Sequence, residues 1–320
     1  MSPVLSFLAD SLGIAMPILL VAMGGLYTEA AGSLNIALEG LMLTGAFAFA
    51  ASAGAAGNVL WGAIVSVAAA CALSLLVALL ADRFSVDVFV AGLAVNLLAQ
   101  GVIGLVSEHV FGTKGVVPLS RLLSSRLDLG FLARVPILGT VLFRQRGVTY
   151  LLIAAAVVLA VAFSRTPFGL RVRAAGMSEG ALRISGVNPA SVRYGAFAAS
   201  GAACALAGMA LTRSVGAWVP NVAAGRGWVA LVVIFLGGKR PWGIAAASLG
   251  FGALFALSNS AQSFFSAPSE LVLALPYAVT AVIVLMGGAK LGGKKGGMNA
   301  SHALGRSRRR SLKRISGRSD

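Results

Sequence analysis

Four polar side chains lie inside apolar stretches of this sequence, in two pairs whose members are four residues apart. The first pair is Asn35 and Glu39, and the second is Asn96 and Gln100. Residues four apart share one face of an α-helix, so each pair predicts a polar patch on an otherwise apolar helix. Donors and acceptors of this kind are what an uncharged, ring-shaped solute needs around it. The four residues are therefore candidates for lining a solute path.

The same residues also have structural interpretations. A carboxylate such as Glu39 can mark a helix end at the water boundary or be satisfied by neighbouring backbone groups, while Asn96 and Gln100 can form hydrogen bonds from helix to helix. Polar groups at membrane depth are costly, so each needs a partner in either interpretation. The sequence leaves the choice open.

The sequence contains few residues of the types that catalyse covalent chemistry. The chain has two histidines, His109 and His302, and its ten acidic residues include no pair at helical spacing within one apolar run. A metal cluster, a Ser/His/Asp arrangement or a general acid and base would need more. Cys71 and Cys204 lie far apart in apolar runs, which favours packing roles. We therefore expect no enzyme activity, no metal and no cofactor bound by this chain.

One segment comes close to a nucleotide-binding motif. The sequence GAKLGGKK, which starts at Gly288, resembles the phosphate loop GxxxxGK[ST], but Lys295 replaces the hydroxyl that would bind Mg²⁺. No strand is predicted before it and no helix after it. Uphill movement of a solute would therefore depend on ATP hydrolysed by another chain.

The composition indicates the elements that position these residues. With 58% hydrophobic and 11% charged residues, the chain is typical of polytopic membrane proteins. Because about 20 apolar residues cross a bilayer as a helix, we expect an all-α membrane helix bundle with about nine transmembrane helices (8–10). The run from Trp228 to Leu236 is short for a full crossing. The runs are Leu12–Tyr27, Ile36–Ala53, Leu60–Ala81, Val88–Val106, Val148–Phe163, Tyr194–Leu211, Trp228–Leu236, Gly243–Leu257 and Leu271–Met286.

The basic residues follow membrane topology although the net charge of +16 invites a nucleic-acid partner. A cytoplasmic C-terminus places the tail 290–320, the segment 164–193, Lys239 with Arg240, and Arg83 on one side, as the positive-inside rule expects. Residues 1–289 then form the transmembrane domain, with a long outer loop at 107–147. The basic tail is predicted to be disordered and to attract anionic lipids, and we expect no nucleic-acid binding.

Small residues within the apolar runs predict close helix contacts, since helices in lipid approach each other through such positions. Three small faces stand out in the sequence. They are Gly101 with Gly104, Gly201 with Ala205 and Gly208, and Gly250 with Gly252.

A charged segment interrupts the apolar runs at residues 164–193, and we call it the island. It contains five arginines and Glu179 among alanines and glycines. Its pattern predicts two short helices within Leu170–Ser185, with a turn near Gly176–Ser178 and an end at Gly186. Short amphipathic helices can rest in a groove of a partner protein. The alternative is a solvated loop whose arginines only fix topology.

Three stretches together resemble the permease subunits of bacterial ABC importers in the branched-chain amino acid and ribose permease superfamily. The stretches are GGLYTEAAGSLNIALEGLMLTGAF from Gly24, GLRVRAAGMSEGALRISGV from Gly169 and GRGWVALVVIFLGGKRPWGIAAASLGFG from Gly225. The sequence LNIALEGLMLTGAF is most similar to that of the subgroup for nucleosides and simple sugars.

The resemblance implies an assembly in the bacterial cytoplasmic (inner) membrane. It contains a second permease, as a homodimer or heterodimer, two ATP-binding cassette ATPase subunits that hold ATP and Mg²⁺, and an extracytoplasmic substrate-binding protein. The island is similar to the loop that couples such a permease to its ATPase, with an arginine before the two alanines where the EAA wording has glutamate. By position, the implied contacts are Arg171, Arg173, Ala174, Ala175, Gly176, Glu179, Ile184 and Gly186.

We therefore predict the permease subunit of an ATP-driven importer for a nucleoside or simple sugar. The alternative is a stand-alone secondary carrier or channel for a small polar solute. A membrane enzyme is disfavoured by the scarcity of histidines and paired carboxylates.

Overall fold

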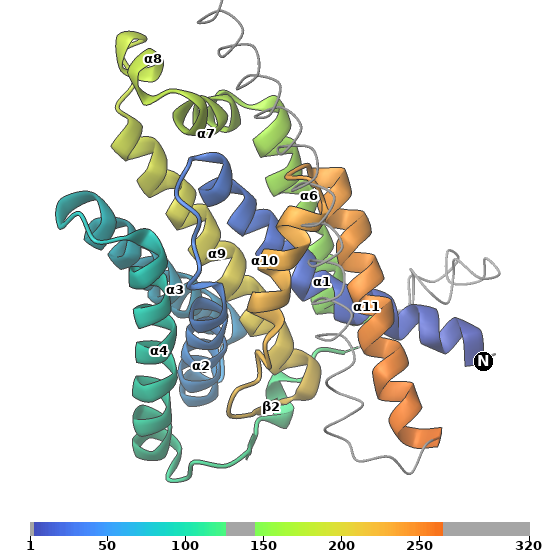
Figure 1. Ribbon diagram of the computed structural model, residues 1–320. Helices are drawn as coiled ribbons and strands as arrows, with labels where there is room; N and C mark the ends of the chain where they lie inside the picture. Colours follow the sequence, from blue (N-terminus) through green and yellow to red (C-terminus); the bar gives the residue numbers. More distant parts are fainter. Residues whose placement is uncertain (1–2, 126–144, 265–320) are drawn as a thin grey trace, which may run out of the picture. The chain divides into compact units, whose positions relative to one another are not determined.

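The computed structural model describes residues 3–125 and 145–264, and within these ranges the chain is helical apart from two strands of two residues each (Figure 1). The elements in chain order are α1 (Pro3–Ala30), α2 (Leu38–Ala56), α3 (Val59–Arg83), α4 (Val88–Phe111), β1 (Val117–Pro118), a 3₁₀ turn (Ser120–Leu122), α6 (Gly147–Arg165), α7 (Pro167–Met177), α8 (Glu179–Ile184), α9 (Pro189–Val215), β2 (Ala217–Trp218), α10 (Arg226–Leu236) and α11 (Pro241–Phe264).

Seven of the described helices are long and apolar enough to cross a membrane, namely α1, α2, α3, α4, α6, α9 and α11. The prediction of an all-α polytopic bundle is thereby confirmed. The run at Trp228 forms α10, whose 11 residues reach about 16 Å at 1.5 Å per residue, roughly half a bilayer core. The predicted run Leu271–Met286 and the tail 290–320 lie outside the described residues, so the count of nine stays a prediction.

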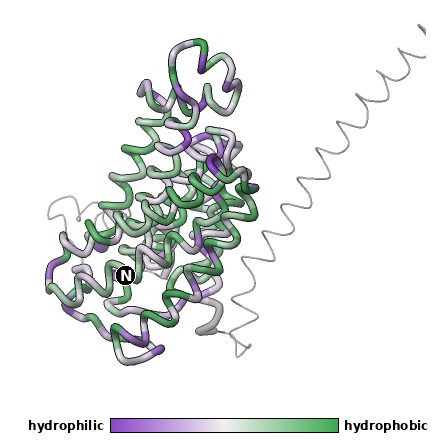
Figure 2. The backbone as a smooth tube through the Cα atoms, turned by 90° about the vertical axis from the view of Figure 1, so that its left-hand side faces the viewer, coloured by the Kyte–Doolittle hydropathy of each residue, from purple (hydrophilic) through white to green (hydrophobic). Residues whose placement is uncertain are grey.

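The two ends of the bundle carry different elements (Figure 1). At one end, the island end, α7 and α8 join the end of α6 to the start of α9. Ion pairs from Arg193 to Asp82 and from Lys239 to Glu29 bring the ends of α3 and α1 to the same side. At the other end, the strand end, β1 pairs antiparallel with β2. Figure 2 shows hydrophobic residues along the helices and many hydrophilic ones toward the ends. The island and the basic turns therefore share one side, as the charge distribution predicts.

Helix α9 packs closely against α2 and α3 through the predicted small face. A Cβ added at Gly201 would lie 2.9 Å from the Ala70 carbonyl oxygen, and one at Gly208 would overlap the Met42 carbonyl oxygen. A Cβ at Gly45 of α2 would lie 2.5 Å from the Cα atom of Ala205. Only small residues permit such backbone approaches, so this part of the packing prediction is confirmed.

The other small faces differ from the prediction. A Cβ at Gly101, Gly104 or Gly250 would meet nothing within 4 Å, whereas one at Gly252 would lie 2.6 Å from the Cβ of Ala15. The contacts expected of Gly101 and Gly104 are therefore not found, because none of the helices that the structure describes covers that side of α4.

Two crossings of the bundle are only partly helical. After α1 ends at the island end, residues 31–37 turn back into the bundle, and α2 begins inside it (Figure 1). From the strand end, residues 219–225 lead inward to the start of α10. Each break leaves backbone N–H groups at a helix start that need partners, because the bundle interior offers no bulk water.

Candidate functional site

The island folds as the two predicted short helices. Thr166 begins α7, its Oγ1 accepting a hydrogen bond from the Gly169 N–H at 3.3 Å, and Ser178 begins α8 in the same way with the Ala181 N–H at 3.3 Å. Such side-chain caps satisfy the first N–H groups of a helix. Gly186 follows α8 with a φ of +80°, a conformation that glycine adopts at little cost.

One side of the island is anchored to the bundle. Val172, Ala175 and Leu182 are buried, and a Cβ at Gly176 would overlap the carbonyl oxygen of Ala30 at the end of α1. The Arg173 guanidinium lies 5.3 Å from the centre of the Phe163 ring, within cation–π range. Within this chain Ala175, Gly176 and Arg173 thus position the island.

The other side of the island is open to a partner. Arg171, Glu179, Ile184 and Gly186 are exposed, and Ala174 is half-buried. Ile184 is 91% exposed, and Met177, which is not among the residues implied by the family resemblance, is 87% exposed. Large apolar side chains exposed beside charged groups, outside the membrane spans, are typical of a binding surface. The sequence could have indicated Met177 as a surface contact, since it is an apolar residue in the turn between two short polar helices.

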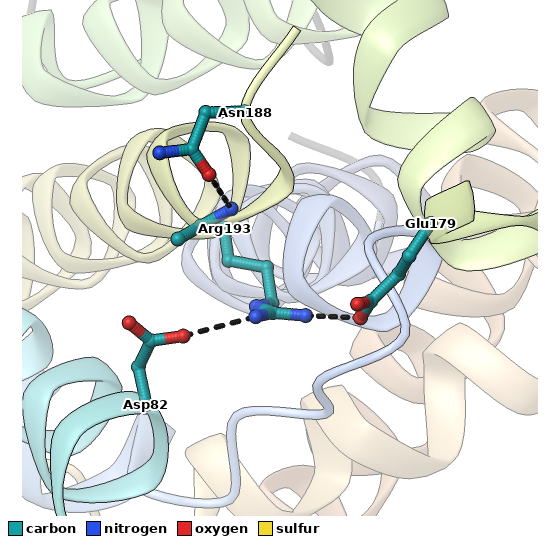
Figure 3. A network of polar contacts seen from close by, with 5 residues as sticks. Asp82, Glu179, Asn188 and Arg193 are labelled. Carbon is teal, nitrogen blue, oxygen red and sulfur yellow. Dashed lines mark hydrogen bonds and ion pairs between the residues drawn. The ribbon is translucent and has the colours of Figure 1, made fainter. Parts of the chain in front are cut away.

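A charged junction ties the island to two long helices (Figure 3). Arg193, near the start of α9, forms ion pairs with Asp82 at the end of α3, at 2.9 Å between Nη2 and Oδ1, and with Glu179 at the start of α8. Glu179 is therefore bound within the chain as well as exposed. No sequence pattern indicates a pair of residues separated by 111 positions.

The polar residues inside the bundle hold the two helix breaks. Asn35 is fully buried, its Oδ1 accepts a hydrogen bond from the Ala37 N–H at 3.0 Å, and its Nδ2 donates to Ser200 Oγ at 3.1 Å. The backbone N–H of Asn35 donates to Thr28 Oγ1 at 3.2 Å. The segment between α1 and α2 is thus attached to both α1 and α9.

Asn96 of α4 completes the start of α2. Its Oδ1 accepts a hydrogen bond from the Gly40 N–H at 2.7 Å, and its Nδ2 donates to the Ile36 carbonyl at 2.9 Å. The side chain supplies one acceptor to a helix start and one donor to the unwound segment before it. Asn96 thereby occupies the helix-to-helix role that the sequence left open.

Glu39 of α2 caps the start of α10. Its two carboxylate oxygens accept hydrogen bonds from the N–H groups of Gly225 and Gly227, both at 2.7 Å. A negative group is favoured at a helix N-terminus by the exposed N–H groups and the helix dipole. A Cβ at Gly227 would lie 2.5 Å from the Cα of Glu39, so the two backbones are in contact.

The four candidate path residues thus divide. Asn35, Glu39 and Asn96 are brought together around the helix breaks, and their polar groups bind this chain. Gln100 is separate from them: it is exposed on α4. The geometry offers no cluster of three or more His, Cys, Asp and Glu within the described residues that could hold a metal ion.

The fold defines the class: a multi-pass membrane protein with two short capped helices at one end. The chain belongs to the family described as "Branched-chain amino acid transport system / permease component", whose model matches residues 7–285. The family is one of transporter permeases, which are not a class of enzyme.

Three relatives of the chain are also named as ABC transporter permeases. The chain is 31% identical to the guanosine ABC transporter permease protein NupQ of Bacillus subtilis (strain 168), over 85% of this chain and 88% of the relative. It is 27% identical to the nucleoside ABC transporter permease protein NupC of Lactococcus lactis subsp. cremoris (strain MG1363), over 87% and 90%. It is 29% identical to the putative glucose ABC transporter permease protein TsgC13 of Haloferax volcanii, over 78% and 75%.

These comparisons confirm the predicted resemblance. The chain is an ABC transporter permease, and this assignment is supported over a stand-alone carrier or channel.

Proposed function

We propose that this chain is the membrane subunit of an importer that brings a nucleoside across the bacterial inner membrane, with a simple sugar as the second candidate. The assignment is supported by two relatives whose names specify guanosine and nucleosides, while a third is named for glucose. The energy comes from ATP and Mg²⁺ on separate ATPase subunits. A second permease and an extracytoplasmic binding protein complete the assembly.

The observation that carries this proposal is the exposed side of the island. Short capped helices that present Met177 and Ile184 beside Arg171 have the form of an insert for a groove in another protein. Of the eight residues implied as ATPase contacts, the exposed ones would touch the ATPase. Arg173 and Ala175 would act by keeping the island seated on the bundle.

The coupling works by movement. Closure of the ATPase subunits displaces α7 and α8, and two attachments pass that displacement into the bundle. One is the pair of ion pairs by which Arg193 of α9 binds Glu179 of α8 and Asp82 of α3, and the other is the contact of Gly176 with the end of α1. The permease pair then exchanges inward-facing and outward-facing arrangements, each favoured by a different state of the ATPase.

The orientation follows from the same scheme. The island end faces the cytoplasm, in agreement with the positive-inside rule, and the strand end faces the binding protein. The C-terminal tail is then cytoplasmic, where its basic residues meet anionic lipids.

The test is to disrupt the exposed apolar surface of the island with substitutions that leave the packing of the bundle unchanged. Met177→Glu with Ile184→Glu places charge on both exposed apolar positions, and we expect loss of ATPase co-purification and of nucleoside uptake in proteoliposomes. Val116→Glu, at the strand end and 57% exposed, is the matched control for the ATPase contact and should leave ATPase co-purification unchanged. Full uptake by the double variant would remove the island from the ATPase contact.

A further inference from the structure

The exposed side of α4 carries one polar group at membrane depth. Leu97 and Val102 are exposed there, as expected for a surface in contact with lipid, but Gln100 is exposed on the same helix. Gln100 lies about 18 Å along α4 from its start at 1.5 Å per residue, near the middle of the span. An amide that faced hydrocarbon without partners would be costly, and the Gln100 side chain makes no hydrogen bond within the described residues.

A cavity lies where the Gln100 amide is exposed. Its volume is about 500 Å³, within the roughly 300–1,000 Å³ typical of small-molecule sites. It lies between α4, Leu43 of α2 and the segment that leads to α10. Gly101 and Gly104 form its floor, and the free space above them is what a Cβ at either position would enter. Lys114, beyond the end of α4, also lines it, so the cavity extends from mid-span to the strand end.

The opposite wall of the cavity is held in place. Trp218 is 1% exposed, and its Nε1–H donates to Ser107 Oγ at 3.0 Å, which fixes the segment after α9 against α4. Asn221 follows with a φ of 56°, and its exposed side chain lies at the lining without a hydrogen bond within the described residues. The Glu39 cap on Gly225 secures the far side of this segment.

We propose that this cavity is a water-filled solute site in the transport path, with Gln100 and Asn221 as its recognition groups. Each amide offers both donors and acceptors, which suits the hydrogen-bonding edge of a base or the hydroxyls of a ribose. Of the described residues that line it, Lys114 alone is charged, and it pairs with Glu108 at 3.2 Å. The site therefore fits an uncharged polar ring. The choice of a nucleoside rests on the proposed function.

Thiol labelling tests whether the cavity holds water. In a Cys71→Ala, Cys204→Ala background assembled with its partners, Gln100→Cys and Gly104→Cys should react with a charged, membrane-impermeant thiol reagent at least tenfold faster than Leu97→Cys. Leu97 is the matched control because it is 71% exposed on the same helix but outside the cavity lining. Equal slow labelling of all three, with and without ATP, would overturn the proposal.

Protection by solute tests recognition. Millimolar guanosine should slow the labelling of Gly104→Cys severalfold, and Gln100→Leu should raise the KM for uptake severalfold. Protection by ribose but not by guanosine would support the site and would overturn the nucleoside assignment alone. Fast labelling that no nucleoside or sugar slows, together with an unchanged KM in Gln100→Leu, would overturn solute recognition at this cavity.

Discussion

The junction at Arg193 gives the most quantitative prediction for coupling. Arg193→Ala removes two ion pairs at once, and their worth follows from their exposure. The Arg193 side chain is 22% exposed and that of Asp82 is 32% exposed. This pair should therefore contribute about 1 kcal/mol, the upper end of the stabilisation measured for surface ion pairs. Glu179 is 48% exposed, and solvent screening reduces its pair to about 0.5 kcal/mol. The two pairs share one guanidinium, so the sum of about 1.5 kcal/mol is an upper bound.

That free energy, about a tenfold change in an equilibrium constant, sets the expected size of the effect. Without Arg193, α8 can move without carrying α3 and α9 with it. In proteoliposomes that contain the whole importer, we expect the Arg193→Ala variant to hydrolyse ATP normally and to import up to about tenfold fewer solute molecules per ATP. High salt should weaken coupling in the wild type in the same direction, because exposed pairs are screened.

Charge reversal separates this role from a general loss of stability. Arg193→Glu places three acidic groups together and should abolish coupling, whereas Arg193→Glu combined with Asp82→Lys and Glu179→Lys should restore much of it. A normal ratio of uptake to ATP hydrolysis in Arg193→Ala would refute the reasoning. So would an Arg193→Glu defect that the two reversed partners leave unchanged while the protein remains folded.

Further predictions concern the helix breaks and the small faces. Glu39→Gln replaces one of the two carboxylate acceptors, which bind Gly225 and Gly227, with a donor. Because a hydrogen bond to a charged group is worth about 1.5–3 kcal/mol, thermal unfolding in detergent should show a loss of stability of that order. Glu29→Gln, which removes the ion pair with Lys239, should cost less than about 1 kcal/mol. Gly208→Ala should sharply lower the yield of folded protein in size-exclusion chromatography, because its methyl group would overlap α2, while Gly101→Ala, which enters free space, should elute as the wild type does.

Local patterns were sufficient to predict the island. Its caps, its glycines and its turn all lie within a few residues of the helices they delimit, so the sequence indicates two helices and a turn between them. The junction at Arg193 was not predictable in this way. Its partner Asp82 is 111 positions away, and only the packing of α3 beside α9 makes the ion pair possible.

The polar residues of the bundle show the same limit. Their spacing identified Glu39 and Asn96 as important, but the sequence could not tell whether they bind solute or backbone. That choice depends on the breaks before α2 and α10, which expose N–H groups inside the bundle. Likewise, the spacing of Gly101 and Gly104 predicts a contact face only if a helix lies opposite. In this chain that side of α4 borders a cavity.

On the proposed function, this chain moves solute only when it is coupled to a separate ATPase. The most direct measurement is guanosine uptake into liposomes that contain either this chain alone or this chain with its ATPase, second permease and binding protein. We predict uptake that requires ATP and every partner, and none by the chain alone under a proton or sodium gradient. Gradient-driven uptake by the chain alone would contradict this dependence on the ATPase.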